Sequence, residues 1–569
     1  MGNFLKTQYA FSSGEIAPEF YATNNMFGVS LLENMDVLQS GGLKRRPGLK
    51  KIKSVASNSI LVPFVISESE KYLLAIYQNT IDVFQNDVKI KTLFAPWMAS
   101  ELKNLQYAQR FNKIYFVHPN HKPQIFSKTS SDFNITDFNF YMNADLSINI
   151  PFIRFEDTRN IDITITNGDD NNHATFTASG DMWDNTWIGT RLYANNKQWL
   201  VESVQSARVA IVHTNGNFTL PNDPVSDWYE AAFGNRRGWP VSVSFHQNRL
   251  VFGGTSSVPN NIWMSKIGEY NNFDVGTGLE DEAIFATLLS AQHHQICTIV
   301  SSYALQILTS VGEWAISNSP LTPSNVDIKQ HTSVGCITTG FLPPQQIDGS
   351  TVFVSASGKD IRELDLDTLN DKYNSVDLCA FSKHLMNNPV SMAYNSGTHQ
   401  LFVVMDNGTM AVFNKYANTE IAAWARYTTD GQFKYVSVMN NETYVVVKRK
   451  NTNYLEKFDN SCLMDAGQYG FSYRVSALPM IVNGHAPKKI RLRKISLRVM
   501  NTKTLFVNDY RMEIPNYAYN EGSQGYTGDL SMNLLGVQRE TMEPLWSISS
   551  SEQLPVTILS VTTEGKYLI

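Results

Sequence analysis

The chain has 569 residues, of which 43% are hydrophobic, 12% aromatic and 17% charged, and its formal net charge is −5. This apolar content is sufficient for large cores and excludes a disordered chain, while the small charge excludes a uniformly basic nucleic-acid-binding protein. The length favours roughly three to four domains. Gly, Thr, Asn, Ser and Val are plentiful and apolar stretches of helical period are rare, so we predict an almost entirely β protein.

The four cysteines are widely spaced and form no CxxC pair: Cys297, Cys336, Cys379 and Cys462. We interpret them as free thiols of a protein made in a reducing cytoplasm, in preference to zinc ligands or disulfides. The first residues lack the apolar core of a secretory signal, and no run of about 18 apolar residues occurs. We therefore expect neither a signal peptide nor a transmembrane helix.

Residues 1–55 contain no amphipathic helical pattern and are predicted to form an N-terminal arm or platform segment, with an extended stretch at 11–20. Six cations without an acid occur between positions 44 and 53: Lys44, Arg45, Arg46, Lys50, Lys51 and Lys53. One interpretation is contact with DNA phosphates or with acidic surfaces of a partner subunit. The simpler alternative is a solvated basic turn at Pro47-Gly48, a dipeptide that is typical of turns.

Short β runs in residues 56–145 predict the first blades of a β-propeller, in which four-stranded meanders are arranged radially. These runs are 59–65, 72–76, 80–84 and 113–117. The segment 108–123 also resembles 245–254, since in both an Asn and a cation precede a short apolar strand. This weak internal repeat supports a propeller.

The sequence pattern changes at residues 146–236, where it predicts a small β-barrel or sandwich inserted between the blades. Side chains of two types alternate regularly at 162–166 and 174–177, as in β-strands. The segment also contains three tryptophans that could stack on sugars if they were exposed, although burial in the core is the commoner fate. They are Trp183, Trp187 and Trp228.

Residues 237–470 are predicted to hold the remaining blades. Short strands at 241–247, 249–253 and 260–265 are separated by Gly, Pro, Asn and Ser, the pattern of a meander. Farther along, Asp-Asn-Gly at 406–408 is a strong hairpin signal.

Residues 471–569 are predicted to form a C-terminal β domain. Its segment 490–499 alternates apolar with polar residues and slips by one position at Arg493-Lys494. A β-bulge there would keep one face apolar, comprising Ile490, Leu492, Ile495, Leu497 and Val499. Four cations would then share the outer face, where they are either solvated or in contact with an acidic subunit or DNA: Arg491, Arg493, Lys494 and Arg498.

The sequence contains no convincing nucleophile elbow, HExxH, P-loop, GxGxxG or pair of carboxylates near a helix signal, and we expect no catalytic residue, no cofactor and no bound metal. His246, His293 and His294 do not stand at metal-ligand spacing from Cys or acidic residues. Two acidic groups do not fit a complete calcium loop. Asp169 with Asp170 is interpreted as a solvated hairpin turn, and Asp365 with Asp367 and Asp371 as a loop between blades.

A series of different short motifs occurs in a defined order along the chain. The series is GEIAP at 14–18, GG at 41–42, RRPG at 45–48, WP at 239–240, HQNRL at 246–250, IWMS at 262–265, YNNF at 270–273, LTS at 308–310, GEW at 312–314, LTPSN at 321–325, GKDIREL at 358–364, DL at 377–378, HL at 384–385, WAR at 424–426 and DG at 430–431. This ordered set resembles the tail nozzle proteins of short-tailed bacteriophages, also called tail tubular protein B or hub and stabilisation proteins. Two departures are Val311, where the family has Gly, and Tyr427, where it has His.

The resemblance implies a structural virion protein without enzymatic activity, made in the host cytoplasm. It implies a homo-oligomer, a hexameric ring beneath the portal and its adaptor ring, through whose axial channel double-stranded DNA leaves without sequence-specific binding. Tail fibre or tail needle proteins would dock on this ring, and the host outer membrane surface is a further expected partner. The alternative class of function is a propeller that binds or hydrolyses glycans of the host surface.

Overall fold

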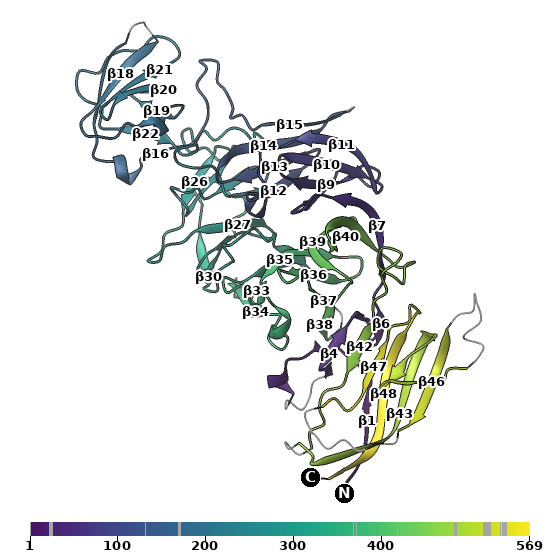
Figure 1. Cartoon of the computed structure of the whole chain (residues 1–569). Helices are drawn as coiled ribbons and strands as arrows, with labels where there is room; N and C mark the ends of the chain where they lie inside the picture. The colour runs from purple at the N-terminus through teal and green to yellow at the C-terminus, as the bar shows by residue number, and fades with distance from the viewer. Residues whose placement is uncertain are drawn as a thin grey trace. The chain divides into compact units, whose positions relative to one another are not determined.

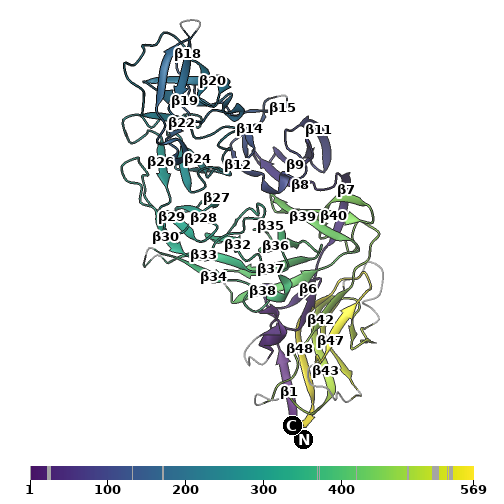
Figure 2. The same cartoon turned by 60° about the vertical axis from the view of Figure 1, so that its left-hand side comes forward.

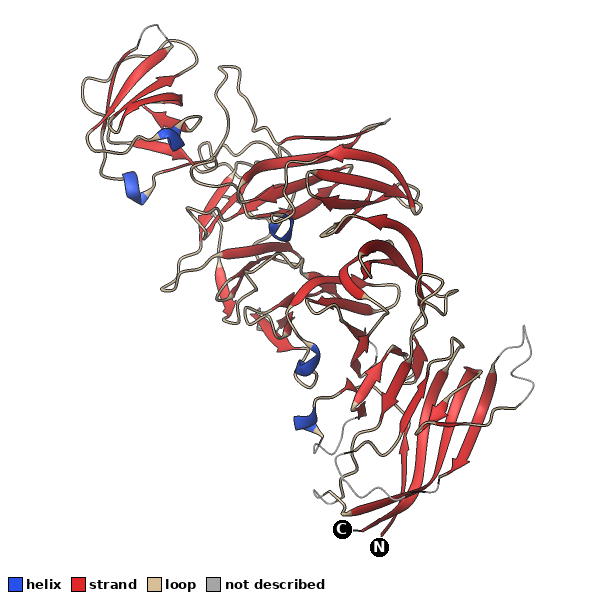
Figure 3. Cartoon of the chain, in the orientation of Figure 1, coloured by secondary structure: helices blue, strands red, loops and turns tan. Residues whose placement is uncertain are grey.

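The computed structural model describes residues 2–21, 27–130, 132–168, 172–367, 369–370, 372–417, 419–482, 486–515, 525–534, 536 and 543–568. Strands form nearly all of the regular structure, as predicted, and the described helices are single 3-10 turns (Figure 3). None of these helices is long and apolar enough to cross a bilayer. The chain divides into two compact units, unit 1 (1–77, 81–92 and 342–569) and unit 2 (78–80 and 93–341).

Unit 1 contains four meanders of the kind that form propeller blades. They are β31–β34 (Gln345–Ile347, Ser350–Val354, Ile361–Asp367, Lys372–Asp377), β35–β38 (Pro389–Asn395, Gln400–Met405, Met410–Tyr416, Ile421–Tyr427), β39–β41 with β7 (Gln432–Met439, Glu442–Arg449, Thr452–Asp459, Gly48–Val55) and β8–β11 (Ile60–Val65, Lys71–Tyr77, Thr80–Gln85, Val88–Phe94). Strand β31 packs on β35, β35 on β39, and β39 on β8. Each meander therefore packs its first strand against the first strand of the next, which is the arrangement of neighbouring blades.

Strand β7 completes its blade from the other end of the chain. It pairs antiparallel with β41, and Gly48 lies opposite Asp459. Leu49 of β7 joins the apolar core between this blade and β35–β38, together with Phe402 and Val447. Residues 48–55 therefore belong to the propeller, and the predicted boundary at position 55 is wrong for this segment.

The remaining N-terminal strands join the C-terminal strands in two sheets. One sheet contains β46, β43, β48, β6 and β5, with β1 on β48; the other joins β38 to β2, β3, β4, β42, β44, β45 and β47. Purple β1 lies beside yellow β48 in both views (Figures 1 and 2). Much of the segment before residue 48 therefore forms strands of these two sheets. The strand bounds are β1 Gly2–Gln8, β2 Gly14–Glu15, β3 Gly28–Val29, β4 Leu31–Glu33, β5 Met35–Val37, β6 Leu43–Arg45, β42 Tyr473–Ser476, β43 Lys489–Thr502, β44 Phe506–Val507, β45 Tyr510–Arg511, β46 Tyr526–Asn533, β47 Ser547–Ser550 and β48 Thr557–Leu568.

The bulge predicted in β43 is confirmed. The register against β48 shifts between Leu492 and Lys494, so that Arg493 and Lys494 together face one step of the partner strand. All five apolar residues of the predicted inner face are buried in the core of these sheets. The four predicted outer cations are exposed.

Unit 2 contains three further meanders and the inserted domain. The meanders are β12–β15 (Gln106–Arg110, Lys113–His118, His121–Lys128, Phe133–Asp137), β23–β26 (Ser242–His246, Arg249–Gly253, Asn261–Met264, Ile284–Thr287) and β27–β30 (Ile296–Ser301, Leu305–Thr309, Glu313–Ile316, Lys329–Thr332). Strand β12 packs on β23, and β23 on β27. The repeat seen in the sequence falls on equivalent hairpins, β12–β13 and β23–β24, whose turns contain positive-φ residues, Phe111 in the first and Gln247 and Asn248 in the second.

The inserted domain is a seven-stranded sheet in the order β16-β22-β19-β20-β21-β18-β17. Ile163 and Val225 exchange two backbone hydrogen bonds, which connects β17 to the segment that precedes β22 and closes the sheet into a small barrel. Its core buries all three tryptophans named above, so none of them offers a face to a sugar. The strands are Phe152–Ile153, Ile163–Asn167, His173–Ala178, Arg191–Ala194, Lys197–Ser206, Val209–His213 and Trp228–Ala231, numbered β16 to β22.

These sheets confirm the predicted fold class. The chain is mainly β and forms a β-propeller with an inserted small barrel and a C-terminal β domain, to which the N-terminal strands contribute.

The bulge gives a prediction about deletions in β43. Deleting Lys494 removes the bulge and leaves inward and outward side chains in regular alternation, with every apolar residue still inward, so it should cost little stability. Deleting Ser496 moves each later side chain of β43 to the opposite face of the sheet, because side chains of a strand alternate between faces. Leu497 and Val499 would then face solvent, at about 1.5–3 kcal/mol each. Thermal unfolding of the two deletion variants measures the difference, and equal losses would contradict the assigned bulge.

Candidate functional site

The structure separates the predicted basic segment into exposed and buried cations. Lys44, Lys50, Lys51 and Lys53 are exposed on β6 and β7. Arg45 and Arg46 are buried, with 3% and 0% of their surface accessible. Both interpretations of the cluster, a solvated turn or a set of DNA or partner contacts, are therefore wrong for the two arginines, because neither guanidinium reaches the surface.

Arg46 is held by a complete set of acceptors. Its Nη1 and Nη2 donate to the two oxygens of Asp465 at 3.0 and 2.8 Å. The other N–H groups donate to Asn34 Oδ1, Pro47 O and Thr428 O at 2.8–2.9 Å. The guanidinium also lies 3.6 Å from the centre of the Phe471 ring. All five donors of the guanidinium are paired, as a buried charge requires.

Arg45 donates instead to neutral oxygens. Its Nη1 donates to the carbonyls of Glu552 and Leu554 at 3.1 and 3.0 Å, and Nη2 to that of Phe471 at 3.0 Å. Burial, with a smaller contribution from the charge of Arg46, lowers the pKa of Arg45 to about 10. The group therefore remains charged at neutral pH and links β6 to the chain around residues 552–554.

A second buried ion pair is connected to the first. Arg449 in β40 donates through Nε and Nη2 to the two oxygens of Glu456 in β41, both at 2.7 Å. Its Nη1 donates to Thr429 Oγ1 at 3.1 Å, and that hydroxyl donates to Asp465 at 2.7 Å. Arg46, Asp465, Thr429, Arg449 and Glu456 thus form one polar chain across unit 1, in which both ion pairs are buried and Thr429 is partly exposed.

A third buried acid, Glu15, fixes the GEIAP segment. Its Oε2 accepts hydrogen bonds from Leu32 N at 2.8 Å and Arg426 Nε at 3.0 Å, and Oε1 is bonded to His384 Nε2 at 2.8 Å and to Arg426 Nη2. Burial by itself raises the pKa of the Glu15 carboxyl, but the hydrogen bonds from His384 and Arg426 and the charge of Arg426 outweigh it, so the pKa lies below its ordinary value.

The position before Glu15 requires glycine, because of its backbone conformation and because there is no room for a side chain. Gly14 has φ +63°, and a Cβ on it would lie 2.4 Å from the carbonyl oxygen of Trp424. Gly14 pairs with Trp424 in parallel, and Arg426 pairs with Glu33, so β2 and β4 extend the sheet of the β35–β38 blade. The blade and the C-terminal domain therefore share one sheet.

The motif segments of the sequence thus meet inside the protein. In unit 1, GEIAP, RRPG, HL, WAR and the residues just before DG all contribute to the buried contacts described above. In unit 2, Arg249 donates to Ser265 O at 2.9 Å, joining HQNRL to IWMS, and Tyr270 donates to Asn248 Oδ1 at 2.7 Å, joining YNNF to them. We call the unit 1 assembly the junction network: Glu15, Asn34, Arg46, His384, Arg426, Thr428, Thr429, Arg449, Glu456 and Asp465.

The outer cations of β43 do not gather into one site. Arg498 forms a bidentate ion pair with Asp529 at 2.8 and 3.0 Å, while Lys494 lies opposite Glu564 in the ladder. Arg491 lies opposite Lys566 and, like Arg493, is exposed. This face therefore carries mixed charge rather than a basic stripe.

The structure brings together one group of potential metal ligands that no sequence motif indicated. Glu101, His118 and His121 in unit 2 each offer a ligand atom within 4.8 Å of the others. The His-x-x-His spacing across a turn could have indicated the two histidines as metal ligands, but no sequence pattern indicates Glu101. Of the acidic turns considered for calcium, residues 169, 170 and 371 lie outside the described residues.

Comparison with known proteins yields structural likenesses alone. No protein-family model and no curated protein matches the sequence. BamB from Moraxella catarrhalis is 9% identical with a TM-score of 0.33, covering 72% of this chain and 100% of that one. The RRP9 WD40 repeats are 8% identical with a TM-score of 0.37, at 73% and 100% coverage. The β-propeller domain of Myceliophteria thermophila Cps50 is 7% identical with a TM-score of 0.35, at 72% and 100%. Identities and scores this low support no statement about function.

The Arg46–Asp465 pair gives a stability prediction. Arg46→Ala leaves the Asp465 carboxylate buried without its cation and should lower the free energy of unfolding by about 3–5 kcal/mol. Lys44→Ala, an exposed neighbour, should change it by no more than about 0.5 kcal/mol. Urea unfolding of the two variants measures the difference. Equal midpoints would show that the pair is not a determinant of unit 1.

Glu15 gives a pH prediction. Because its pKa is lower in the folded protein, its ionised form stabilises the fold above the ordinary glutamate pKa of about 4.3, and this contribution is lost as pH falls through the folded-state pKa. The Glu15→Gln variant should therefore be less stable than the parent at pH 7, and the difference in stability between the two proteins should become smaller in acid. Thermal unfolding across pH tests this, with the exposed Glu420→Gln as control. A gap independent of pH would refute it.

Proposed function

We propose that this chain is a subunit of the tail nozzle of a short-tailed bacteriophage, and that six copies form a ring beneath the portal and adaptor. DNA would leave through the channel of this ring, and tail fibres or a needle would dock on it. The chain would then be a structural component of the virion rather than an enzyme.

The proposal rests on one observation: the motifs by which the sequence resembles that family contact one another in the folded protein. Segments as distant as 14–18 and 424–426 contact each other through the Glu15–Arg426 pair. These motif residues supply ion pairs and strand contacts that hold distant segments together, with the partly exposed His384 and Arg426 both bound to the buried Glu15. Such residues suit a protein whose task is to keep its shape within an assembly.

Electrostatics is compatible with a conduit. Each subunit has a formal charge of −5, so a closed ring would repel a passing polyanion rather than bind it tightly. The exposed lysines of β6 and β7, namely Lys44, Lys50, Lys51 and Lys53, are suited to contacts with an acidic surface of the adaptor or of the next subunit. Lys51 also lies 3.7 Å from the ring centre of Tyr454 within the same chain.

The experiment is electron microscopy and sedimentation of the purified chain, alone and with portal–adaptor complexes of short-tailed phages. The expected result is a closed six-fold ring with a central hole, because conduits are rings built from heterologous contacts. A chain that remains monomeric at every concentration, also with adaptor present, would refute the proposal.

A charge variant refines the same experiment. Lys44, Lys50 and Lys53 changed together to Ala should weaken ring or adaptor binding at low salt, and the difference from the parent should shrink as salt screens the attraction. Arg45 and Arg46 are left unchanged because they are buried. The matched control changes three exposed lysines elsewhere in unit 1, Lys359, Lys372 and Lys450. Equal effects of the two triple variants would assign the change to net charge rather than to this surface.

A further inference from the structure

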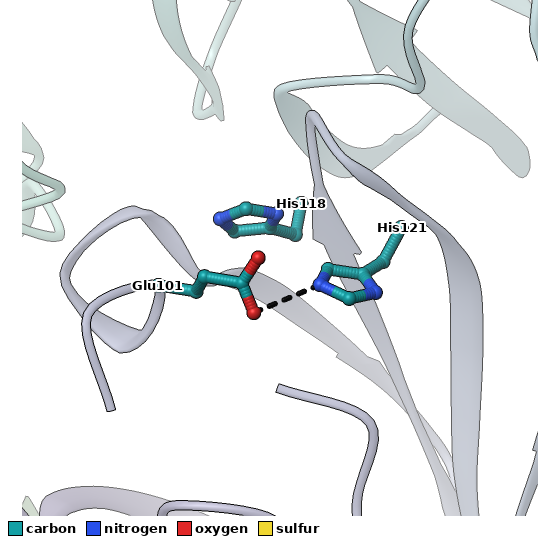
Figure 4. A group of neighbouring side chains, drawn as sticks. All are labelled: Glu101, His118 and His121. Carbon is teal, nitrogen blue, oxygen red and sulfur yellow. Dashed lines mark hydrogen bonds and ion pairs between the residues drawn. The ribbon is translucent and has the colours of Figure 1, made fainter. Parts of the chain in front are cut away.

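Two histidines and a glutamate converge at one hairpin of unit 2. His118 ends β13 and His121 begins β14, and the two residues are paired across the Pro119-Asn120 turn. Their ring centres lie 5.2 Å apart. Glu101, which precedes the single-turn helix at Leu102–Asn104, places its carboxylate against them, and Oε2 lies 2.9 Å from His121 Nε2 (Figure 4).

The three side chains are held in place by their surroundings. Glu101 Oε2 also accepts a hydrogen bond from Met98 N at 2.8 Å, which fixes the carboxylate. The turn between the histidines is anchored by Trp239 N, which donates to Pro119 O at 2.9 Å. His118 is 2% exposed, whereas the side chains of His121 and Glu101 are 26% and 21% exposed. The group is therefore preformed, and it is open to solvent on one side.

The ring of His118 is the observation that points to a ligand. Its Nε2 is buried and has no hydrogen-bond partner among the described residues, and its Nδ1 has the 3.2 Å contact from Asn120 N. A buried ring nitrogen without a partner is unusual in a native protein.

We propose that Glu101, His118 and His121 together bind one divalent transition-metal ion. Two imidazoles and one carboxylate are the three-ligand set that zinc accepts while keeping a further position for water or another ligand. Binding would replace the Glu101–His121 hydrogen bond by two bonds to the ion and would give His118 Nε2 its missing partner. The ring proton of each histidine would then be on Nδ1, and at His118 this replaces the 3.2 Å hydrogen bond from Asn120 N. The proposal is independent of the tail nozzle assignment.

The donor set also predicts which ions bind. Imidazole nitrogen suits Zn²⁺, Ni²⁺ and Co²⁺, whereas Ca²⁺ and Mg²⁺ need mainly oxygen ligands, of which this group offers one carboxylate. Zn²⁺ should therefore bind, and Ca²⁺ should not compete with it.

The test uses the full chain, stripped with a chelator and freed of any affinity tag. Zn²⁺ binding is measured by competition with a chromophoric chelator, and the visible spectrum of bound Co²⁺ reports the coordination. We expect the parent to bind about one equivalent tightly. His121→Ala and Glu101→Gln should each weaken binding by at least about 10- to 100-fold, the loss typical when only a second-shell partner is removed.

The inserted barrel provides a matched control. His173 lies 3.0 Å from Glu202 and its ring centre is 5.1 Å from that of His213, a similar trio that does not bring three ligand atoms within range. His173→Ala should leave Zn²⁺ affinity unchanged. Absence of Zn²⁺ binding by the parent, or equal losses in His173→Ala and His121→Ala, would overturn the proposal. Circular dichroism of each variant confirms that the comparison is between folded proteins.

Discussion

The bidentate pair between Arg46 and Asp465 is the constraint on which unit 1 depends. The two residues are 419 positions apart in the sequence, and neither side chain is exposed. Through Asn34 the pair reaches the segment between β4 and β5, and through Thr429 it reaches Arg449 in β40. The N-terminal strands, a blade and the C-terminal domain are therefore held in one arrangement by charges that cannot be separated without leaving one of them buried alone.

This kind of interaction selects a structure more than it stabilises one. A buried ion pair contributes little more than well-packed apolar residues would, but it strongly disfavours any arrangement that removes one partner. The register of β7 on β41, with Gly48 opposite Asp459, is one that allows Arg46 to reach Asp465. A slip of β7 would cost this contact as well as the burial of Leu49, so the strand has one favourable position on its blade.

The sequence predicted local structure well and the buried ion pairs not at all. Strand β24 occupies the predicted segment, and the phase slip at Arg493-Lys494 located the bulge, because both depend on side-chain alternation within a few residues. The burial of Arg46 could not be predicted, since its partner is remote in the sequence and a run of cations usually indicates a solvated surface. His118 and His121 had a recognisable spacing, but Glu101 joins them through a turn that leaves no pattern in the sequence.

The pairing of β7 with β41 also determines the order in which the chain can fold during synthesis. Gly48 leaves the ribosome 411 residues before Asp459, its neighbour in the blade. At about 5–20 residues per second, β7 waits roughly 20–80 s for that partner. Unit 2 is almost continuous in sequence and can form in the meantime. Throughout this interval β1 and β7 lack β48 and β41, the strands that pair with them in the native protein, so the nascent N-terminus has open strand edges that chaperones would need to cover.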